Sequence, residues 1–186
     1  MLRVTVPPTG NPLLSLDEIK AHLRIESDDT SEDAGLTALG ALAVEVVEGE
    51  THRAYAERTL DWVLPGFADR IRLPLAPVIA VEAVTYTDLA GAVQTLDPAQ
   101  YGVQPSGEGR ALVPRWGTCW PCVGQGAEPV RIVFRAGGAT ALPPRVRQAA
   151  LLLCGHYYEH RESVAAGGLA ELPQGVDALL SPERWA

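Results

Sequence analysis

The sequence predicts an α+β protein in which three helices form a bundle and a β-rich insertion separates the second helix from the third. Two observations about periodicity support this fold class. Apolar residues recur at helical spacing up to about residue 57 and again after residue 143. In the region between these two, they recur at every second residue, as in β-strands. The size fits as well, because 186 residues with 47% hydrophobic and 20% charged side chains suit one domain with its own core.

The first helix is expected to begin at Ser15. Ser15 and Glu18 have the spacing of a capping box, and Leu16, Ile19 and Leu23 form an apolar stripe behind it. Residues 26–33 are polar and acidic, which predicts a loop.

A second, longer helix is expected from about Ser31 to about Arg53, because apolar residues repeat at helical spacing along it. Gly40 and Gly49 each weaken such a helix by about 1 kcal/mol relative to Ala, unless a neighbouring element must approach closely.

About six short strands are expected between residues 59 and 135, in runs rich in β-branched and aromatic residues that Pro, Gly or Asp separate. Asp88 to Gly91 has the composition of a hairpin turn, so antiparallel pairing is predicted.

Pro144 suits the first turn of a third helix, which should run to about Arg161. The two ends of the chain are rich in Pro and Gly and carry no clear period, so they are expected to be an arm and a tail. The predicted organisation of this single domain is an extended arm (1–13), the first part of the helical bundle (14–57), the β-rich insertion (58–137), the second part of the bundle (138–166) and an extended C-terminal docking tail (167–186).

The net charge of -8 is concentrated in one stretch, because residues 15–61 contain twelve acidic and four basic side chains. This surplus argues against tight binding to nucleic acid phosphates, and its plainest interpretation is a solvated helix face. No apolar run approaches the roughly 20 residues of a membrane span, so no membrane contact is expected. An odd count of three cysteines favours a reducing compartment and synthesis in the cytoplasm.

Two motifs suggest chemistry without completing a site. Cys119 and Cys122 form a CxxC, but the sequence after them is a poor helix, so we interpret them as two loop cysteines. His156, Glu159 and His160 match the HxxEH pattern of zinc-dependent hydrolases. A third ligand is not evident among the three glutamates that follow, namely Glu162, Glu171 and Glu183. We therefore expect no enzyme and no cofactor, and keep a zinc hydrolase as the alternative.

A series of short motifs runs in order along most of the chain. The series comprises residues 14–25 before the acidic loop, Arg72-Leu73-Pro74, Pro77-Val78, residues 81–88, Leu96-Asp97-Pro98, Tyr101, Trp120-Pro121, residues 130–137, Pro144, Arg147-Gln148-Ala149, residues 155–162 and Leu179-Leu180-Ser181-Pro182. In this order they resemble the head-to-tail connector (adaptor) proteins of tailed bacteriophages, including those of gene transfer agents.

The resemblance implies a structural role in the neck of a phage or phage-like particle. About twelve copies would form a ring under the portal protein, extend the DNA channel, and offer a face to a tail-side stopper or tail terminator protein. DNA would pass through this channel without specific binding.

Two groups of residues are candidates for this role. The carboxylates of the acidic loop would face the channel and repel phosphates: Glu26, Asp28, Asp29, Glu32 and Asp33. The apolar residues of the tail are too many for a solvent-exposed end and would dock on the portal: Leu169, Leu172, Val176, Leu179, Leu180 and Trp185. The alternative for the tail is that it folds back over the bundle of its own chain.

Overall fold

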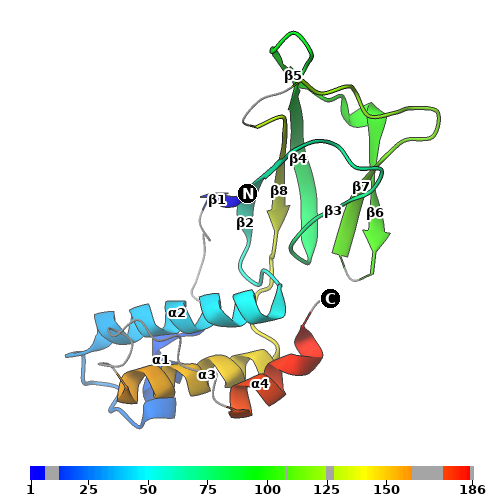
Figure 1. The fold of residues 1–186 in the computed structure, drawn as a ribbon. Helices are drawn as coiled ribbons and strands as arrows, with labels where there is room; N and C mark the ends of the chain where they lie inside the picture. Colours follow the sequence, from blue (N-terminus) through cyan, green and yellow to red (C-terminus); the bar gives the residue numbers. More distant parts are fainter. Residues whose placement is uncertain (7–12, 108, 125–127, 161–173, 185–186) are drawn as a thin grey trace. The chain divides into compact units, whose positions relative to one another are not determined.

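The computed structural model describes residues 1–6, 13–107, 109–124, 128–160 and 174–184 (Figure 1). The chain divides into two compact units, and each contains segments that lie far apart in the sequence. The β-rich unit comprises Met1–Thr9 and Ala56–Gly138, and the helical unit comprises Gly10–Tyr55 and Ala139–Ala186.

The described residues form four α-helices and eight strands in two antiparallel sheets, so the predicted three-helix bundle with a β insertion and an extended tail is wrong. Helix α4 (Gln174–Leu180) lies in the segment interpreted as a tail. Seven residues hold too few apolar repeats for a visible period, and Gly175 in the first helical turn has a low helix propensity. Strand β1 (Leu2–Val6) was not predicted either, because the prolines that follow it indicated an irregular arm.

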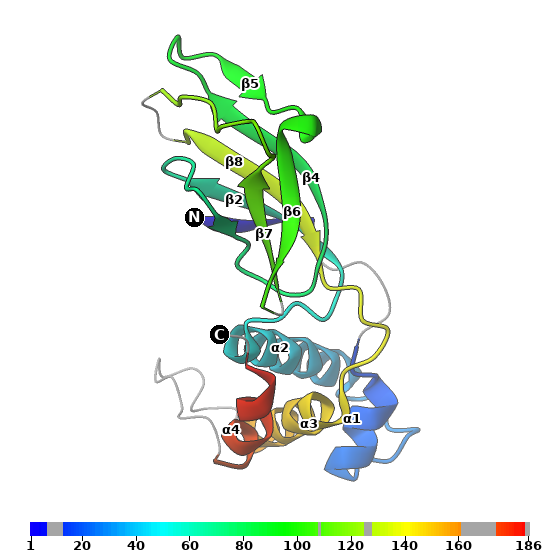
Figure 2. The ribbon, with the colours of Figure 1, turned by 90° about the vertical axis from the view of Figure 1, so that its right-hand side faces the viewer.

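The helical unit packs four helices around one core, as Figure 2 shows: α1 (Leu16–Leu23), α2 (Asp33–Thr51), α3 (Pro144–Glu159) and α4, which the 3-10 turn η3 (Ser181–Glu183) follows. The predicted capping box at Ser15 is formed, because the Ser15 and Glu18 side chains each bond the other residue's backbone N–H. Large buried side chains come from all four helices, including Ile19, Leu36, Val47, Leu153 and Leu180.

The β-rich unit contains a five-stranded sheet of order β1-β2-β8-β4-β5 and a three-stranded sheet of order β3-β7-β6. The remaining bounds are β2 (Arg58–Leu64), β3 (Ile71–Arg72), β4 (Val78–Thr87), β5 (Val93–Thr95), β6 (Tyr101–Ser106), β7 (Gly109–Pro114) and β8 (Val130–Ala136), with a 3-10 turn η1 (Pro98–Gln100) before β6.

Strand β8 lies in the middle of the larger sheet and shows why these residues form strands. Val130, Ile132 and Phe134 are fully buried, while Arg131 and Arg135 alternate with them on the opposite face. In both ribbon views the three-stranded sheet covers one face of the larger sheet (Figures 1 and 2). The arginine face is the polar side of the sheet.

Candidate functional site

The whole excess of negative charge belongs to the helical unit. By sequence this unit contains fifteen acidic and seven basic side chains, whereas the β-rich unit contains eight of each. Any electrostatic effect on a polyanion would therefore come from the helices and their loops.

The loop between α1 and α2 is built around a buried lysine. The Nζ atom of Lys20 lies 2.7 Å from the Asp29 carbonyl oxygen, 3.4 Å from that of Ser27 and 2.6 Å from Oδ1 of Asp33. Lys20 is only 3% exposed. One side chain of α1 thus bonds the loop backbone and the first residue of α2 together.

The five predicted channel-facing carboxylates fall into two groups. Glu26, Asp28 and Asp29 are exposed. The Asp29 carboxylate also accepts bonds from the hydroxyl and the backbone N–H of Ser31, which lowers its pKa below the ordinary value.

The other two carboxylates are bound inside the unit. Oε2 of Glu32 accepts a 2.8 Å bond from the Tyr158 hydroxyl on α3, and Asp33 pairs with Lys20. The five residues therefore lie in the loop and at the first residue of α2, and three of them face solvent.

One feature of the sequence indicates that Lys20 is buried and paired with a polar partner. Lys20 is the only lysine of the chain, and it follows Leu16 by four residues and precedes Leu23 by three. It therefore lies on the apolar side of its helix, where a charge requires a partner.

The described part of the C-terminal segment packs on its own unit. Val176 and Leu180 are fully buried in the helical core, and Leu179 packs against it. Leu169, Leu172 and Trp185 lie outside the described residues.

Polar contacts join the same segment to the C-terminal end of α2 and the residues just after it, and one contact lies within the segment. Arg184 donates to Glu50 at 2.9 Å and to Asp177 at 2.7 Å, and Nε of Arg53 donates to the Glu183 carbonyl oxygen at 2.8 Å. In this conformation α4 covers the helices of its own chain, so docking of Val176 and Leu180 elsewhere would require α4 to leave them.

The HxxEH motif lies at the end of α3. The ring centroids of His156 and His160 are 4.6 Å apart, and Nδ1 of His160 lies 3.0 Å from the His156 carbonyl oxygen. Within the described ranges no three His, Cys, Asp or Glu side chains gather as a metal site would need. Glu162 and Glu171 lie outside these ranges.

The CxxC motif belongs to the connection between β7 and β8, where Cys119 and Cys122 are exposed free thiols. Trp120 between them stacks on Phe67, with ring centroids 4.8 Å apart and planes at 4°. The described residues of this connection, 115–124 and 128–129, contain no helix whose dipole could activate a redox thiol.

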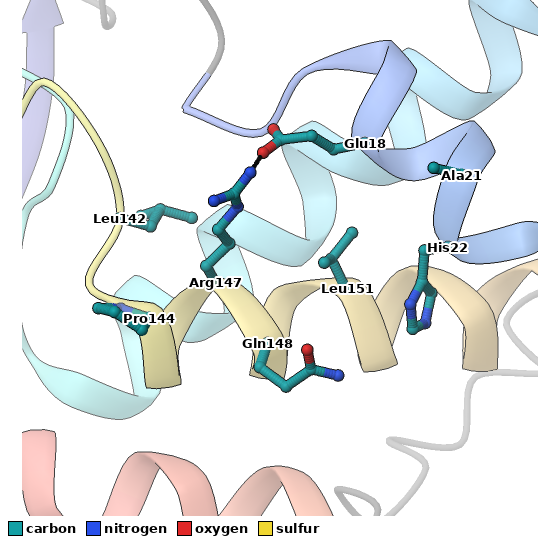
Figure 3. Close-up of a pocket in the computed structure, with 8 residues that line it drawn as sticks. All are labelled: Glu18, Ala21, His22, Leu142, Pro144, Arg147, Gln148 and Leu151. Carbon is teal, nitrogen blue, oxygen red and sulfur yellow. Dashed lines mark ion pairs between the residues drawn. The ribbon is translucent and has the colours of Figure 1, made fainter. Parts of the chain in front are cut away.

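A surface hollow of about 540 Å³ lies between α1 and α3 (Figure 3). Leu142 and Leu151 line it, and Arg147 points across it to Glu18, with which it forms an ion pair. Glu18 also caps α1, so this pair ties the first helix to the third. Sequence reasoning missed this contact, because it depends on how two distant helices pack.

Among the residues that the structure describes, no helix is long and apolar enough to cross a membrane.

Comparisons with known proteins point to one kind of particle. No family model matches the chain, and no curated protein does. The solved structures that it resembles include the neck of an empty gene transfer agent (GTA) particle computed with C6 symmetry, at 30% identity and a TM-score of 0.78. They also include the virion of a native GTA particle, at 31% and 0.75, and the neck of a native GTA particle computed with C12 symmetry, at 30% and 0.75.

Each of these three matches covers all of this chain and 96% of the other chain. Identity of 30% or more along the full length, with the same fold, shows common family membership and not merely a shared architecture. The chain therefore belongs to the head-to-tail connector (adaptor) family of tailed bacteriophages and gene transfer agents, structural proteins of the particle neck.

Proposed function

We propose that this chain forms a ring of about twelve copies under the portal, extends the DNA channel and provides the face to which the tail attaches. The observation that carries this proposal is the full-length match to a native GTA neck computed with C12 symmetry. Rotational symmetry repeats one contact between unlike surfaces of neighbouring copies until the ring closes. In this role the chain has no catalytic activity.

The charge distribution supports a channel through which DNA slides. Affinity for DNA comes from Lys and Arg that neutralise phosphates, and the helical unit has a net surplus of eight carboxylates. The exposed Glu26, Asp28 and Asp29 are the parts of the acidic loop that would face the DNA. A negatively charged channel wall repels phosphates, so DNA would pass it without binding.

The portal is the proposed partner on the head side, with the C-terminal segment as its contact, and a stopper or tail terminator is the proposed partner on the tail side. Docking through Val176 and Leu180 would require α4 to exchange its own core for a groove on the portal. Such an exchange is energetically accessible, because α4 is short and the ion pair that joins its segment to α2, Arg184 with Glu50, is exposed. Each buried side chain contributes about 1.5 to 3 kcal/mol in either place.

The test is a particle that lacks this protein. Removing its gene from the parent phage or GTA should leave DNA-filled heads without tails, and adding purified protein should restore tail attachment. Electron microscopy of the restored neck should then show a ring of this chain between portal and tail. Complete, tailed particles from which the protein is absent would contradict the proposal.

A further inference from the structure

We propose that Lys20 is the positioning residue of the acidic loop, a built-in cation that holds Glu26 and Asp28 at fixed places on the surface of the helical unit. The part of this proposal that concerns DNA depends on the function proposed above. The part that concerns the loop does not, since it follows from the contacts of one side chain.

The contacts of Lys20 are directed into the unit. Its ammonium group donates to two carbonyl oxygens of the loop backbone, and Oδ1 of Asp33 lies 2.6 Å away as its ion-pair partner. The side chain is only 4% exposed, so the loop and Asp33 supply the polar surroundings of this charge. The loop is folded around this group much as a loop folds around a metal cation.

The burial of this charge needs a reason beyond packing. On its helix Lys20 lies between Leu16 and Leu23, where an apolar side chain would contribute to the core without a desolvation cost. The group that gains from the charge is the loop, whose backbone carbonyls and Asp33 would otherwise lack this donor. Lys20 therefore stabilises a particular loop conformation more than it stabilises the helix.

A second contact holds the far end of the loop. Tyr158 on α3 donates to Glu32, so the residues on either side of the turn into α2 are bound to two different helices. Asp33 and Glu32 are thereby used internally, and Glu26 and Asp28 remain as outward charges. In a ring, fixed carboxylates would produce the same repulsive potential in every copy, whereas a mobile loop could turn its charges away from passing DNA.

Hydrogen exchange of the purified full-length protein tests the loop directly. In Lys20→Met, which keeps the length and apolar stem of the side chain, amides of residues 27–33 should exchange about tenfold faster, while those of β2 and β8 stay unchanged. Asp33→Asn, which removes one charge and keeps the shape, should show a smaller increase of about threefold. Asp28→Asn, matched in chemistry but pointing to solvent, should show no change.

The variants also separate the two parts of the proposal. Unchanged loop exchange in folded Lys20→Met and in Asp33→Asn would overturn the role of Lys20. If Lys20→Met does not fold, the comparison of Asp33→Asn with Asp28→Asn gives the same decision, because equal exchange in these two also overturns it.

A particle assay addresses the DNA. Heads complemented with Asp33→Asn, or with Glu26→Gln and Asp28→Asn together, should assemble tails normally but deliver DNA severalfold less efficiently. Normal delivery by both would overturn the link between the loop and DNA passage. Failure of even the unchanged protein to enter the particle would instead contradict the proposed function.

Discussion

Arg131 on β8 forms a bidentate ion pair with Asp61 on β2. Its Nε lies 2.8 Å from Oδ1, and a terminal guanidinium nitrogen lies 2.6 Å from Oδ2. The Asp61 side chain is 7% exposed and that of Arg131 46%. A two-point contact of this kind fixes geometry as well as charge. It joins neighbouring strands at a place where the sheet buries a carboxylate.

Arg131→Met should lower the free energy of unfolding by about 1 to 3 kcal/mol, because it leaves the buried Asp61 carboxylate without its partner. Arg135→Met is the matched control on the same strand. Its partners Glu57 and Glu82 are both more than 40% exposed, so the expected loss is at most about 1 kcal/mol. Urea unfolding measures both, and equal losses would show that burial of Asp61 does not matter.

The two glycines of α2 should respond in opposite ways to alanine. A Cβ at Gly49 would meet nothing within 4 Å, so Gly49→Ala should raise the free energy of unfolding by about 1 kcal/mol. A Cβ at Gly40 would come within 2.6 Å of Cδ1 of the buried Ile19, so Gly40→Ala should gain nothing or lose up to about 2 kcal/mol. Thermal unfolding of the pair checks the prediction, and a gain at Gly40 would refute the close approach of α1.

Local patterns predicted much of the helical unit but not its fourth helix. The capping box at Ser15 and the apolar repeat of α2 are determined by residues close in sequence, so both could be predicted from it. Helix α4 and strand β1 are short, and each is stabilised by contacts with distant segments. The same holds for the candidate site, since the pairing of Tyr158 with Glu32 depends on tertiary packing.

The C-terminal cap of α2 departs from the usual preference for glycine. The residue after the helix, His52, adopts the left-handed conformation, with φ 53°, that Gly usually adopts at this position. The N–H of His52 donates to the Glu48 carbonyl, and the Glu48 side chain accepts from the N–H of Tyr55 at 2.7 Å. These bonds hold the turn in place and offset the strain of a residue with a Cβ.

Burial raises the pKa of the Cys154 thiol to about 11. The folded state therefore holds this proton more tightly than the unfolded state. The stability that results is fully present below about pH 9 and is lost as the pH rises toward 11, by up to about 2 to 3 kcal/mol. Urea unfolding between pH 8 and pH 11 should show this loss, and Cys154→Ala should reduce it.

Part of the alkaline loss should remain in Cys154→Ala, since burial also raises the pKa values of Tyr55, Tyr101 and Tyr157. Cys119→Ser is the control substitution, because it removes a thiol that is exposed and not part of the core. An identical pH dependence in Cys154→Ala and the unchanged protein would contradict the assignment of the effect to this thiol.

Helix α4 should be part of the folded core in the free protein. Leu180→Ala removes a fully buried side chain and should lower the free energy of unfolding by about 2 to 4 kcal/mol. Ala178→Ser on the exposed side of the same helix should change it by less than about 0.5 kcal/mol. A change below about 0.5 kcal/mol in Leu180→Ala would mean that α4 is released in solution.

Portal binding by the same variant tests whether Leu180 is used both in the core of its own chain and in the contact with the portal. If α4 leaves its core and docks through Leu180, Leu180→Ala weakens the free and the docked state alike and changes portal affinity little. Tighter portal binding by this variant would show that α4 leaves its core but that other residues contact the portal.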